Sequence, residues 1–504
     1  MCGIAGIWGR VAPGSVRAMM ASQCHRGPDG EGLHVEPGFG VIGHTRLAIM
    51  DPRGGRQPIH NEDRSATIVA NGMIYNHPQL RRRLRRPHRF GSESDSETIL
   101  HAFEEHGLVT PRLLDGMFAF AIATGERLFL ARDPIGIKPL YYAQVASTSG
   151  AETFYFASEL KALTSQVAEI NEFPPGSCYD SQTGFHRYYR VPDRVPRELP
   201  LEIHLRRVRE TVEAAVVKRL LSDVPLGAFL SGGLDSSIIT AIARRHMPEL
   251  HTFSVGVEGS RDLQAARRVA EHIGTIHHEY VYTAAEVLEK LPEIVYYLES
   301  FDQDLVRSAI PTYFCARLAA EHVKVVLTGE GADELFAGYS YHKSIDGAEA
   351  LHRELRRSVT CLHNVNLQRV DRMTMRHSVE ARVPFLDTGV IELAQSITPE
   401  WKLYRFDGDR LVEKWILRKA FEDLLPSDIL WRHKEQFDEG SGTVDLIPAV
   451  LEQVASEAGA ATYAAQHARD RLRTAEECLY HRLLVSQFER PEAVLANVGR
   501  WHSG

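Results

Sequence analysis

The sequence predicts an α/β protein of two domains. Its 504 residues are more than a single hydrophobic core usually holds, which favours at least two domains. Three prolines within residues 191–200 indicate a semi-rigid linker, so we place the boundary between domains 1–198 and 199–504. Beyond this linker, strand and helix signals alternate, which indicates a mainly parallel sheet covered by helices.

Charge and composition narrow the classes of partner. The net charge of −8 gives no general attraction to nucleic acid or an anionic membrane, and no apolar run approaches the roughly 20 residues that span a bilayer. The first ten residues lack the layout of a secretory signal, and the six cysteines include no Cys-x-x-Cys pair that would indicate disulfides or zinc. We therefore expect a cytoplasmic protein with small-molecule partners, without nucleic acid or membrane, and we allow for a homodimer.

Cys2 is the first candidate for chemistry. Removal of Met1 would leave a cysteine whose own α-amino group, with an ordinary pKa of about 8, accepts the thiol proton close to neutral pH. The alternative is a buried thiol at the start of a strand.

Other segments of this half carry polar groups that suit a ligand. Residues 26–29, from Arg26 to Asp29, are predicted to form a turn with exposed groups for ion pairing, and the strand over residues 43–51 brings Arg46 out of an apolar run. Asn71-Gly72 is either a hairpin turn after strand 68–70 or a pair of donors for an oxyanion. Asp95 precedes a helix predicted over residues 98–106, where it either caps the helix or holds an ammonium group.

A dense basic run covers residues 81–89. Such a run either binds a phosphate-rich partner or forms a solvated helix face, and we prefer the solvated face because no aromatic residues interleave with it. We also interpret Lys138 as a structural turn residue and not as a catalytic base.

The second domain begins with a helix predicted over residues 201–221, followed by a candidate phosphate cradle. Residues 224–230 form an apolar strand, residues 235–245 have helical spacing, and Ser231-Gly232-Gly233 is the tight turn between them. Adjacent glycines let N–H groups approach an anion at the positive end of a helix, with hydroxyls of Ser231, Ser236 and Ser237 around it. No Gly-Lys-Ser/Thr follows, so this is not a Walker loop, and a plain glycine turn is the alternative.

A second turn is expected at the same edge of the sheet. Strands are predicted over residues 252–257, 277–281 and 323–327, with a helix over 262–273, and the last strand leads into Gly329-Glu330-Gly331. Because ligands bind outside the carboxyl ends of parallel strands, both turns face one crevice. Neighbouring strand residues point to opposite faces, so we do not predict a metal site at His277 and His278.

Together these segments resemble one family. The first domain carries CGI at 2–4, RGPD at 26–29, GHTRL at 43–47, NG at 71–72, SD at 94–95, DGMFAFA at 115–121, ARDPIGIKPLYY at 131–142 and FASELKAL at 156–163. The second carries SGGLDSS at 231–237, LTGEGADELFAGY at 327–339 and RHKEQF at 432–437. In this order they resemble the glutamine-hydrolysing (class B) asparagine synthetases. The resemblance implies an N-terminal αββα glutaminase sandwich of the N-terminal-nucleophile class. It also implies a C-terminal parallel-sheet synthetase domain of the adenine-nucleotide α-hydrolase (PP-loop) type.

The resemblance assigns roles in the first domain. Cys2 would attack the side-chain amide of glutamine, and Asn71 with the backbone of Gly72 would stabilise the oxyanion. Arg46 would bind the α-carboxylate and Asp95 the α-ammonium group, both through charge-assisted hydrogen bonds. The backbone nearest to the glutamine would be that of Leu47, Ala48, Ile49 and Met50.

One residue departs from the family pattern. The family usually has Asn-Gly-Glu at residues 71–73, whereas this chain has Met73, whose thioether carries no charge. The loss of one charge-assisted contact costs about 1–3 kcal/mol. We hypothesise a weaker glutamine site and greater use of free ammonia.

In the second domain the resemblance implies an ATP site with Mg²⁺. The ATP-binding residues would be Phe229, Ser231, Gly232, Gly233, Leu234, Asp235, Ser236, Val255, Thr328, Gly329 and Lys434. Asp235 and Asp333 would hold Mg²⁺ on the pyrophosphate, since hard oxygen ligands suit that ion. Glu330 would support formation or capture of an acyl-adenylate, and Lys434 would neutralise charge as pyrophosphate leaves.

The implied activity is that of a carbon–nitrogen ligase. ATP would adenylate the β-carboxylate of aspartate, and ammonia released from glutamine would displace AMP to give asparagine. Family members pass the ammonia through an internal tunnel. Two alternatives stay open, namely an amide-forming ligase for another carboxylate and a nucleotide-binding scaffold without catalysis.

Overall fold

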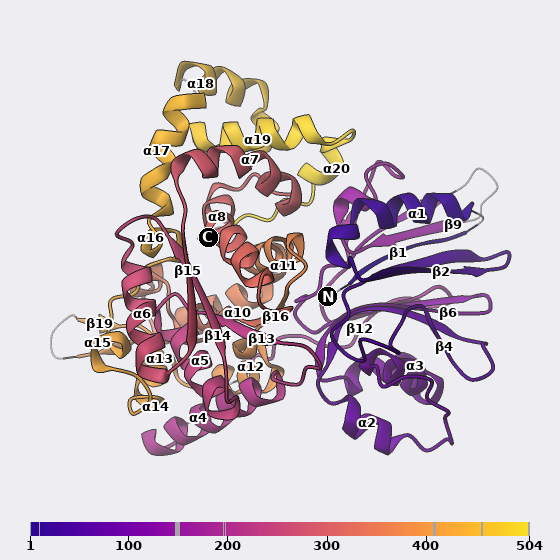
Figure 1. Ribbon diagram of the computed structural model, residues 1–504, viewed down its shortest axis with the longest axis horizontal. Helices are drawn as coiled ribbons and strands as arrows, with labels where there is room; N and C mark the ends of the chain where they lie inside the picture. The colour runs from indigo at the N-terminus through magenta and orange to yellow at the C-terminus, as the bar shows by residue number, and fades with distance from the viewer. Residues whose placement is uncertain are drawn as a thin grey trace.

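The computed structural model describes residues 2–9, 11–146, 152–194, 196, 198–406, 410–454 and 457–501. Two bodies lie side by side in Figure 1, a sandwich of two sheets formed by the N-terminal residues and a larger body around a parallel sheet. Among the described residues, no helix combines the length and the apolar composition needed to cross a membrane.

The N-terminal sandwich has four layers. One antiparallel sheet has the strand order β10-β8-β9-β1-β3-β2, and the other has the order β12-β11-β7-β6-β5-β4. Helix α1 (Pro13–Ser22) packs on the first sheet, while α3 (Asp95–His106) packs on the second and α2 (His77–Arg83) packs against α3. Side chains such as Ile4, Ile42 and Val69 fill the space between the sheets. The expected αββα fold is confirmed.

The strands of the sandwich are short and regular. Their bounds are β1 Gly3–Trp8, β2 Gly30–Glu36, β3 Gly40–Arg46, β4 Ile59–His60, β5 Thr67–Ile74, β6 Gly116–Thr124, β7 Arg127–Arg132, β8 Tyr141–Ala146, β9 Glu152–Ala157, β10 Asn171–Glu172, β11 Ser177–Asp180 and β12 Gly184–Arg187. The 3₁₀ turns η1 (Cys24–Arg26), η2 (Gly107–Leu113) and η3 (Leu160–Ala162) complete this body.

Asn71-Gly72 does not form a hairpin turn, so that prediction is wrong. Strand β5 continues through both residues and pairs Asn71 with Ala119 and Gly72 with Phe118 of β6. Gly72 has φ +155°, and a Cβ at this position would lie 2.0 Å from the carbonyl oxygen of Met117. The glycine therefore permits close approach of two strands, and this pairing outweighs the local turn preference.

The second body is built on a five-stranded parallel sheet, as predicted. Its strand order is β15-β14-β13-β16-β17, with β13 (Leu226–Phe229), β14 (His251–Gly256), β15 (Ile276–Val281), β16 (Val325–Leu327) and β17 (Glu380–Arg382). Because the chain moves to one side of β13 with β14 and to the other with β16, the order reverses at β13. The carboxyl end of β13 therefore opens a crevice where ligands bind in such sheets.

Helices cover this sheet and extend beyond it. The larger ones are α4 Leu201–Lys218, α5 Leu234–His246, α6 Arg261–Ile273, α7 Ala284–Leu298, α8 Gln303–Ala320, α10 Ala348–Cys361, α11 Asn366–Arg376, α12 Thr388–Gln395, α17 Thr443–Val454, α18 Glu457–Gln466 and α19 Ala475–Gln487. The shorter ones are α9 Ala332–Phe336, α13 Pro399–Lys402, α14 Trp415–Ala420, α15 Ser427–Leu430, α16 Phe437–Gly440 and α20 Pro491–Leu495. A small pair of strands, β18 (Tyr404–Arg405) and β19 (Leu411–Val412), lies among them, with the 3₁₀ turns η4 Ser340–Ser344, η5 Leu362–Asn364, η6 Pro384–Leu386 and η7 Ala468–Asp470.

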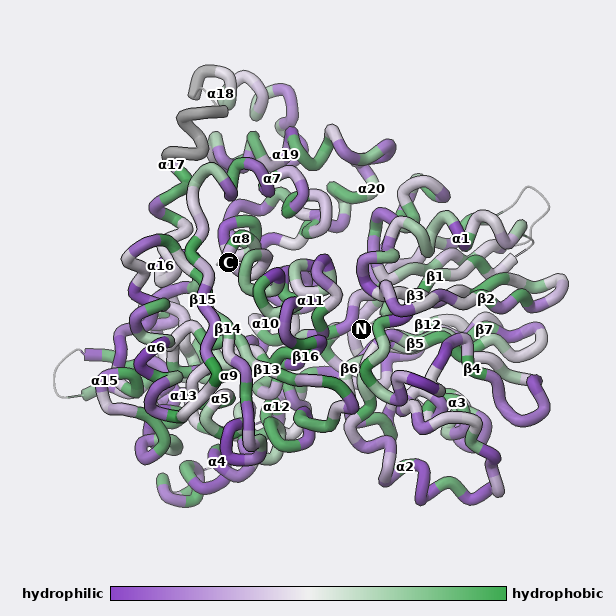
Figure 2. The backbone as a smooth tube through the Cα atoms, in the orientation of Figure 1, coloured by the Kyte–Doolittle hydropathy of each residue, from purple (hydrophilic) through white to green (hydrophobic). Residues whose placement is uncertain are grey.

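The central strands β13 and β16 form part of the buried apolar core of this body. Val325, Val326 and Leu327 of β16 have no exposed surface. Figure 2 shows hydrophobic residues in green along these inner strands, while the outer helices alternate between purple and green. Burial on both faces explains why the central strands β13 and β16 appear in the sequence as short apolar runs.

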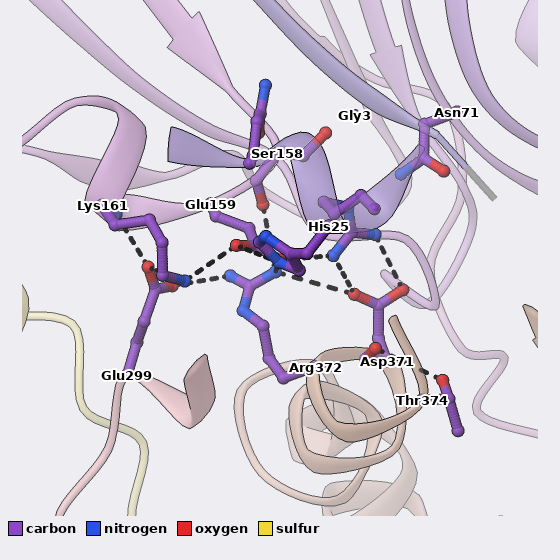
Figure 3. A network of polar contacts seen from close by, with 12 residues as sticks. Gly3, His25, Asn71, Ser158, Glu159, Lys161, Glu299, Asp371, Arg372 and Thr374 are labelled. Carbon is purple, nitrogen blue, oxygen red and sulfur yellow. Dashed lines mark hydrogen bonds and ion pairs between the residues drawn. The ribbon is translucent and has the colours of Figure 1, made fainter. Parts of the chain in front are cut away.

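A buried network of charged side chains joins the two bodies (Figure 3). We name it the interface network, and its members are Arg26, Glu159, Lys161, Glu299, Asp371 and Arg372. The Arg26 guanidinium donates to the carboxylates of Glu159 and Asp371, each at 2.7 Å. The predicted ion pairing of the turn 26–29 is present at Arg26 and Asp29, but Arg26 has no exposed surface, so the predicted exposure holds only for Asp29. The partner of Arg26, Asp371, lies 345 residues later in the chain, on α11.

We expect Asp371→Asn to lower the free energy of unfolding by about 3 kcal/mol, because it leaves part of the Arg26 charge buried without a partner. Urea unfolding at pH 7 measures this change. Asp193→Asn is the matched control, since the Asp193 side chain is 71% exposed and its loss is expected to cost less than about 0.5 kcal/mol. Equal stability of the two variants would contradict a structural role for the interface network.

Candidate active sites

The first candidate site lies where β1 and β5 face each other across the sandwich. The backbone N–H of Cys2, directly before β1, donates to Asn71 Oδ1 of β5 at 3.1 Å. Its Sγ lies 3.8 Å from the carbonyl oxygen of Leu47, and burial raises the pKa of the thiol. The Asn71 side chain is fully buried, and its Nδ2 donates to no acceptor among the described residues. An amide donor of this kind beside a thiol is suited to an oxyanion.

Arg46 ends β3 but does not emerge from the apolar run as predicted. Its guanidinium turns back and donates to the carbonyl oxygens of Asp51 at 2.7 Å and Pro52 at 3.2 Å, and the residue is only 8% exposed. The backbone N–H of Ala48 donates to Asp29 Oδ2 at 2.7 Å. Arg46 and Asp29 therefore hold residues 47–52 as an ordered loop next to Cys2.

Asp95 begins α3, three residues earlier than the predicted helix start. The Ser94 hydroxyl accepts from the N–H of Ser96 and caps the helix, so Asp95 is not the cap. Its Oδ2 accepts from the backbone N–H of Ile74 at 2.8 Å, and burial raises the pKa of its carboxyl to about 6. Since Ile74 follows Asn71 on β5, the carboxyl lies along the same strand as the candidate oxyanion donor.

The Ser231-Gly232-Gly233 turn lies between β13 and α5, as the sequence predicts. Gly232 has φ +69°, and a Cβ there would lie 2.5 Å from Ala265 of α6, so this position requires glycine. The hydroxyls of Ser231 and Ser236 lie 3.2 Å apart. The prediction that the Ser237 hydroxyl surrounds the anion is wrong. This hydroxyl donates to the carbonyl oxygen of Gly233 at 2.7 Å and does not face the crevice.

A cavity of about 490 Å³ opens beside this turn. It is lined by every predicted nucleotide and metal residue except Gly232, and by Glu330. Strands β13 and β16 are hydrogen-bonded neighbours, which explains why the two predicted turns face one crevice.

The cavity holds two carboxylates and two ammonium groups in contact. Lys414 Nζ lies 2.5 Å from Asp235 Oδ2 and 2.6 Å from Asp333 Oδ1, and Lys434 Nζ lies 3.0 Å from Asp333 Oδ2. Although burial acts in the opposite direction, the two lysines hold the pKa of Asp333 well below its usual range. The two carboxylates and two ammonium groups carry no net charge together. A polyanion can therefore bind here without meeting a large excess of negative charge.

Glu330 occupies a different part of the same cavity. Its carboxylate accepts from the guanidinium of Arg369 on α11, and burial raises its pKa although Arg369 opposes this. Nearby, the Tyr339 hydroxyl donates to Glu334 at 2.5 Å, and the Asn366 amide donates to the same carboxylate at 3.1 Å.

Comparison with known proteins finds one family model over each of the two bodies. Residues 1–183 match the glutamine amidotransferase domain model, and residues 207–347 and 343–503 match the asparagine synthase model. The chain belongs to the asparagine synthase family. Asparagine synthetase [glutamine-hydrolyzing] 3 of Arabidopsis thaliana is 42% identical over 467 residues, covering 88% of this chain and 79% of the relative. The asparagine synthetase [glutamine-hydrolyzing] of Asparagus officinalis is 38% identical over 525 residues, covering 97% and 86%.

Lys414 and Arg369 are among the cavity residues of this asparagine synthase family member that the sequence analysis missed. Lys414 precedes α14 in the left-handed conformation (φ +52°), and no local pattern marks it. Arg369 lies in a segment to which we assigned no chemistry. Its spacing of three from Arg372 puts two arginines on one face of a helix, and that signal could have indicated a role in charge pairing.

Proposed function

We propose that the protein is a glutamine-hydrolysing asparagine synthetase, which converts ATP, L-aspartate, L-glutamine and water to AMP, pyrophosphate, L-asparagine and L-glutamate. The observation that carries the proposal is the presence of two distinct sites in one chain, Cys2 against Asn71 and the cavity with Asp235 and Glu330. We assign glutamine hydrolysis to residues 1–198 and the synthetase reaction to residues 199–504. A cytoplasmic location and a homodimer stay predictions.

In the first site, the α-amino group of Cys2, free once Met1 is removed, takes the thiol proton. The thiolate attacks the amide carbon of glutamine, and Asn71 Nδ2 with the N–H of Gly72 stabilises the oxyanion. Ammonia leaves, and water hydrolyses the thioester to glutamate. The Arg46 guanidinium releases the backbone carbonyl oxygens of Asp51 and Pro52 and binds the α-carboxylate of glutamine. Asp95 binds the α-ammonium group.

In the second site, an oxygen of the aspartate β-carboxylate attacks the α-phosphorus of ATP, and pyrophosphate leaves. Backbone N–H groups of residues 231–236 and the ammonium of Lys434 stabilise the departing charge. Ammonia then attacks the acyl carbon of β-aspartyl-AMP and AMP leaves. Glu330 supports formation or capture of this intermediate.

Asp235 and Asp333 fit Mg²⁺ by their chemistry. Both present carboxylate oxygens at the cavity, and Asp235 Oδ1 is buried and accepts no hydrogen bond within the described part of the chain. We propose that these two residues hold the ion. When bound, it neutralises negative charge on the pyrophosphate group.

Product analysis with ATP, Mg²⁺ and either glutamine or ammonium, across a panel of carboxylic acids, tests the proposal. We expect asparagine, AMP and pyrophosphate from aspartate with both nitrogen donors. Amidation of another acid in place of aspartate would support the alternative ligase. Failure of every acid to drive exchange of pyrophosphate into ATP would overturn the synthetase assignment.

Glutamine binding is expected to weaken as the pH falls below about 6. The Asp95 carboxyl, whose pKa is raised to about 6 by burial, is anionic above that pH and binds the ammonium group only in that form. Below it, affinity falls by up to about tenfold per pH unit. Calorimetry with Cys2→Ala, which binds without hydrolysis, measures this from pH 7.5 to 5. Asp95→Asn is expected to bind weakly at every pH, and a flat profile for Cys2→Ala would contradict the role of Asp95.

Met73→Glu is expected to lower the glutamine KM of hydrolysis by about tenfold or more, because it restores one charged contact with the substrate. Met73 is buried in the apolar cluster between the two bodies, so Met73→Gln serves as a control of similar shape without the charge. A KM that is unchanged in Met73→Glu, or lowered equally in Met73→Gln, would exclude a charge effect.

A further inference from the structure

Four ionisable side chains converge on the outer helical layer of the sandwich, apart from the residues assigned to catalysis. They are Glu62 from the β4–β5 loop, His88 from the segment after α2, and His101 and Glu104 from α3. We name them the two-histidine cluster. One ligand atom of each lies within 4.8 Å of the ligand atoms of all the others.

The spacing within the two-histidine cluster suits a small divalent ion. His101 Nδ1 lies 2.7 Å from Glu104 Oε2 and 3.9 Å from Glu62 Oε2, while His88 Nδ1 lies 3.3 Å from Glu62 Oε1 and 3.7 Å from Glu104 Oε2. In a tetrahedral Zn²⁺ site with bonds of about 2.0–2.1 Å, neighbouring ligand atoms are about 3.3 Å apart. The observed distances bracket this value, so small rotations of the side chains suffice.

Both imidazoles are oriented as metal ligands usually are. Each presents Nδ1 to the cluster and turns Nε2 towards a further carboxylate. His88 Nε2 lies at hydrogen-bond distance from Glu105 Oε1, 3.2 Å, whereas His101 Nε2 lies 3.6 Å from Glu97 Oε1, beyond that distance. Metal-binding histidines characteristically donate to a carboxylate through the other ring nitrogen, which fixes the tautomer and makes the ligand more basic, and His88 has this arrangement.

The basic run of residues 81–89 positions one ligand. Helix α2 ends at Arg83, and Glu105 Oε1 accepts from the backbone N–H groups of Arg85 and Arg86, each at 2.8 Å. Glu62 Oε1 accepts from the N–H of Arg89 at 2.6 Å. These bonds fold the segment back over α3 and place His88 next to His101, with ring centroids 4.4 Å apart. The arginine side chains at residues 82, 83, 85, 86 and 89 are exposed, as predicted, but the predicted helix face is wrong beyond Arg83, where α2 ends.

Charge and burial favour a cation at this place. The side chains of His88 and His101 are 6% and 0% exposed, and four carboxylates surround them, those of Glu62, Glu97, Glu104 and Glu105. Backbone N–H groups and the Asn61 amide donate to these carboxylates, but neutral imidazoles would leave the cluster without a positively charged partner for them. Either a bound ion or protonation of the imidazoles supplies that positive charge, and imidazole and carboxylate are both ligand types that bind Zn²⁺.

We propose that the two-histidine cluster is a structural Zn²⁺ site. Four protein ligands close the coordination sphere, so the ion has no open position for catalysis. It fastens residues 84–90 to α3, the helix whose first residue is Asp95. Loss of the ion therefore loosens the outer layer of the sandwich without removing any catalytic group.

Zinc titration of the EDTA-treated full-length protein, by calorimetry and by thermal melting, tests this site. We expect one Zn²⁺ at the two-histidine cluster and a Zn²⁺-dependent rise of Tm. His88→Gln is the chosen variant because His88 lies nearer the surface than His101, and circular dichroism checks its fold. We expect its affinity to fall by at least about 100-fold, since even loss of a supporting carboxylate weakens metal sites by about 10–100-fold.

Two controls identify which residues hold the ion. His251, His278 and His322 also place ring nitrogens within 4.8 Å of one another, so His278→Gln tests whether zinc binds there instead. His186→Gln removes a half-buried histidine of β12 outside both groups. We expect both control variants to keep the Tm rise that His88→Gln loses. Retention of binding and of the Tm rise in His88→Gln, or absence of zinc binding by the wild type, would overturn the proposal and leave protonated imidazoles as the partners of these carboxylates.

Discussion

The ion pair between Arg26 and Asp371 is the interaction on which the rest of the arrangement depends. Arg26 Nε donates to the carbonyl oxygen of Cys2 at 3.0 Å, while its terminal nitrogens bind carboxylates from both bodies. Asp371 lies on α11, and two residues earlier the same helix supplies Arg369 to Glu330. A single helix therefore contacts Cys2, the proposed nucleophile, through Arg26, and lines the cavity of the other site directly. Buried charges persist only where each is paired, so the two bodies have one well-defined relative position.

Charge balance is the second constraint. In the cavity, Lys414 and Lys434 compensate Asp235 and Asp333, which keeps four ionised groups close together in a largely buried place. In the proposed reaction, this group would exchange partners when the pyrophosphate part of ATP and its cation bind. In the interface network, charge balance has a different consequence. There the charged side chains pair with one another, so no partner is available for exchange with a ligand. The first arrangement suits catalysis and the second suits rigidity.

The sequence predicts the local parts of this structure well and the long-range parts poorly. The strand–turn–helix around Ser231 and the parallel sheet were predictable because apolar runs, glycines and helical spacing act over a few residues. Arg26 was placed wrongly because its partner lies 345 residues away. Asn71-Gly72 was placed wrongly because pairing with β6 overrides the turn preference of the dipeptide. Lys414 carries no local signal, since its position follows from the packing of α14.

The most direct test of a coupled pair of sites is the fate of the glutamine amide nitrogen. The protein is given ATP, Mg²⁺, aspartate and glutamine labelled with ¹⁵N in the side-chain amide, with unlabelled ammonium in excess, and the asparagine formed is analysed by mass spectrometry. Transfer between two fixed sites predicts ¹⁵N in the asparagine side chain well above its share of the free ammonium pool. Label only at the level of that pool would contradict coupling between Cys2 and the nucleotide cavity.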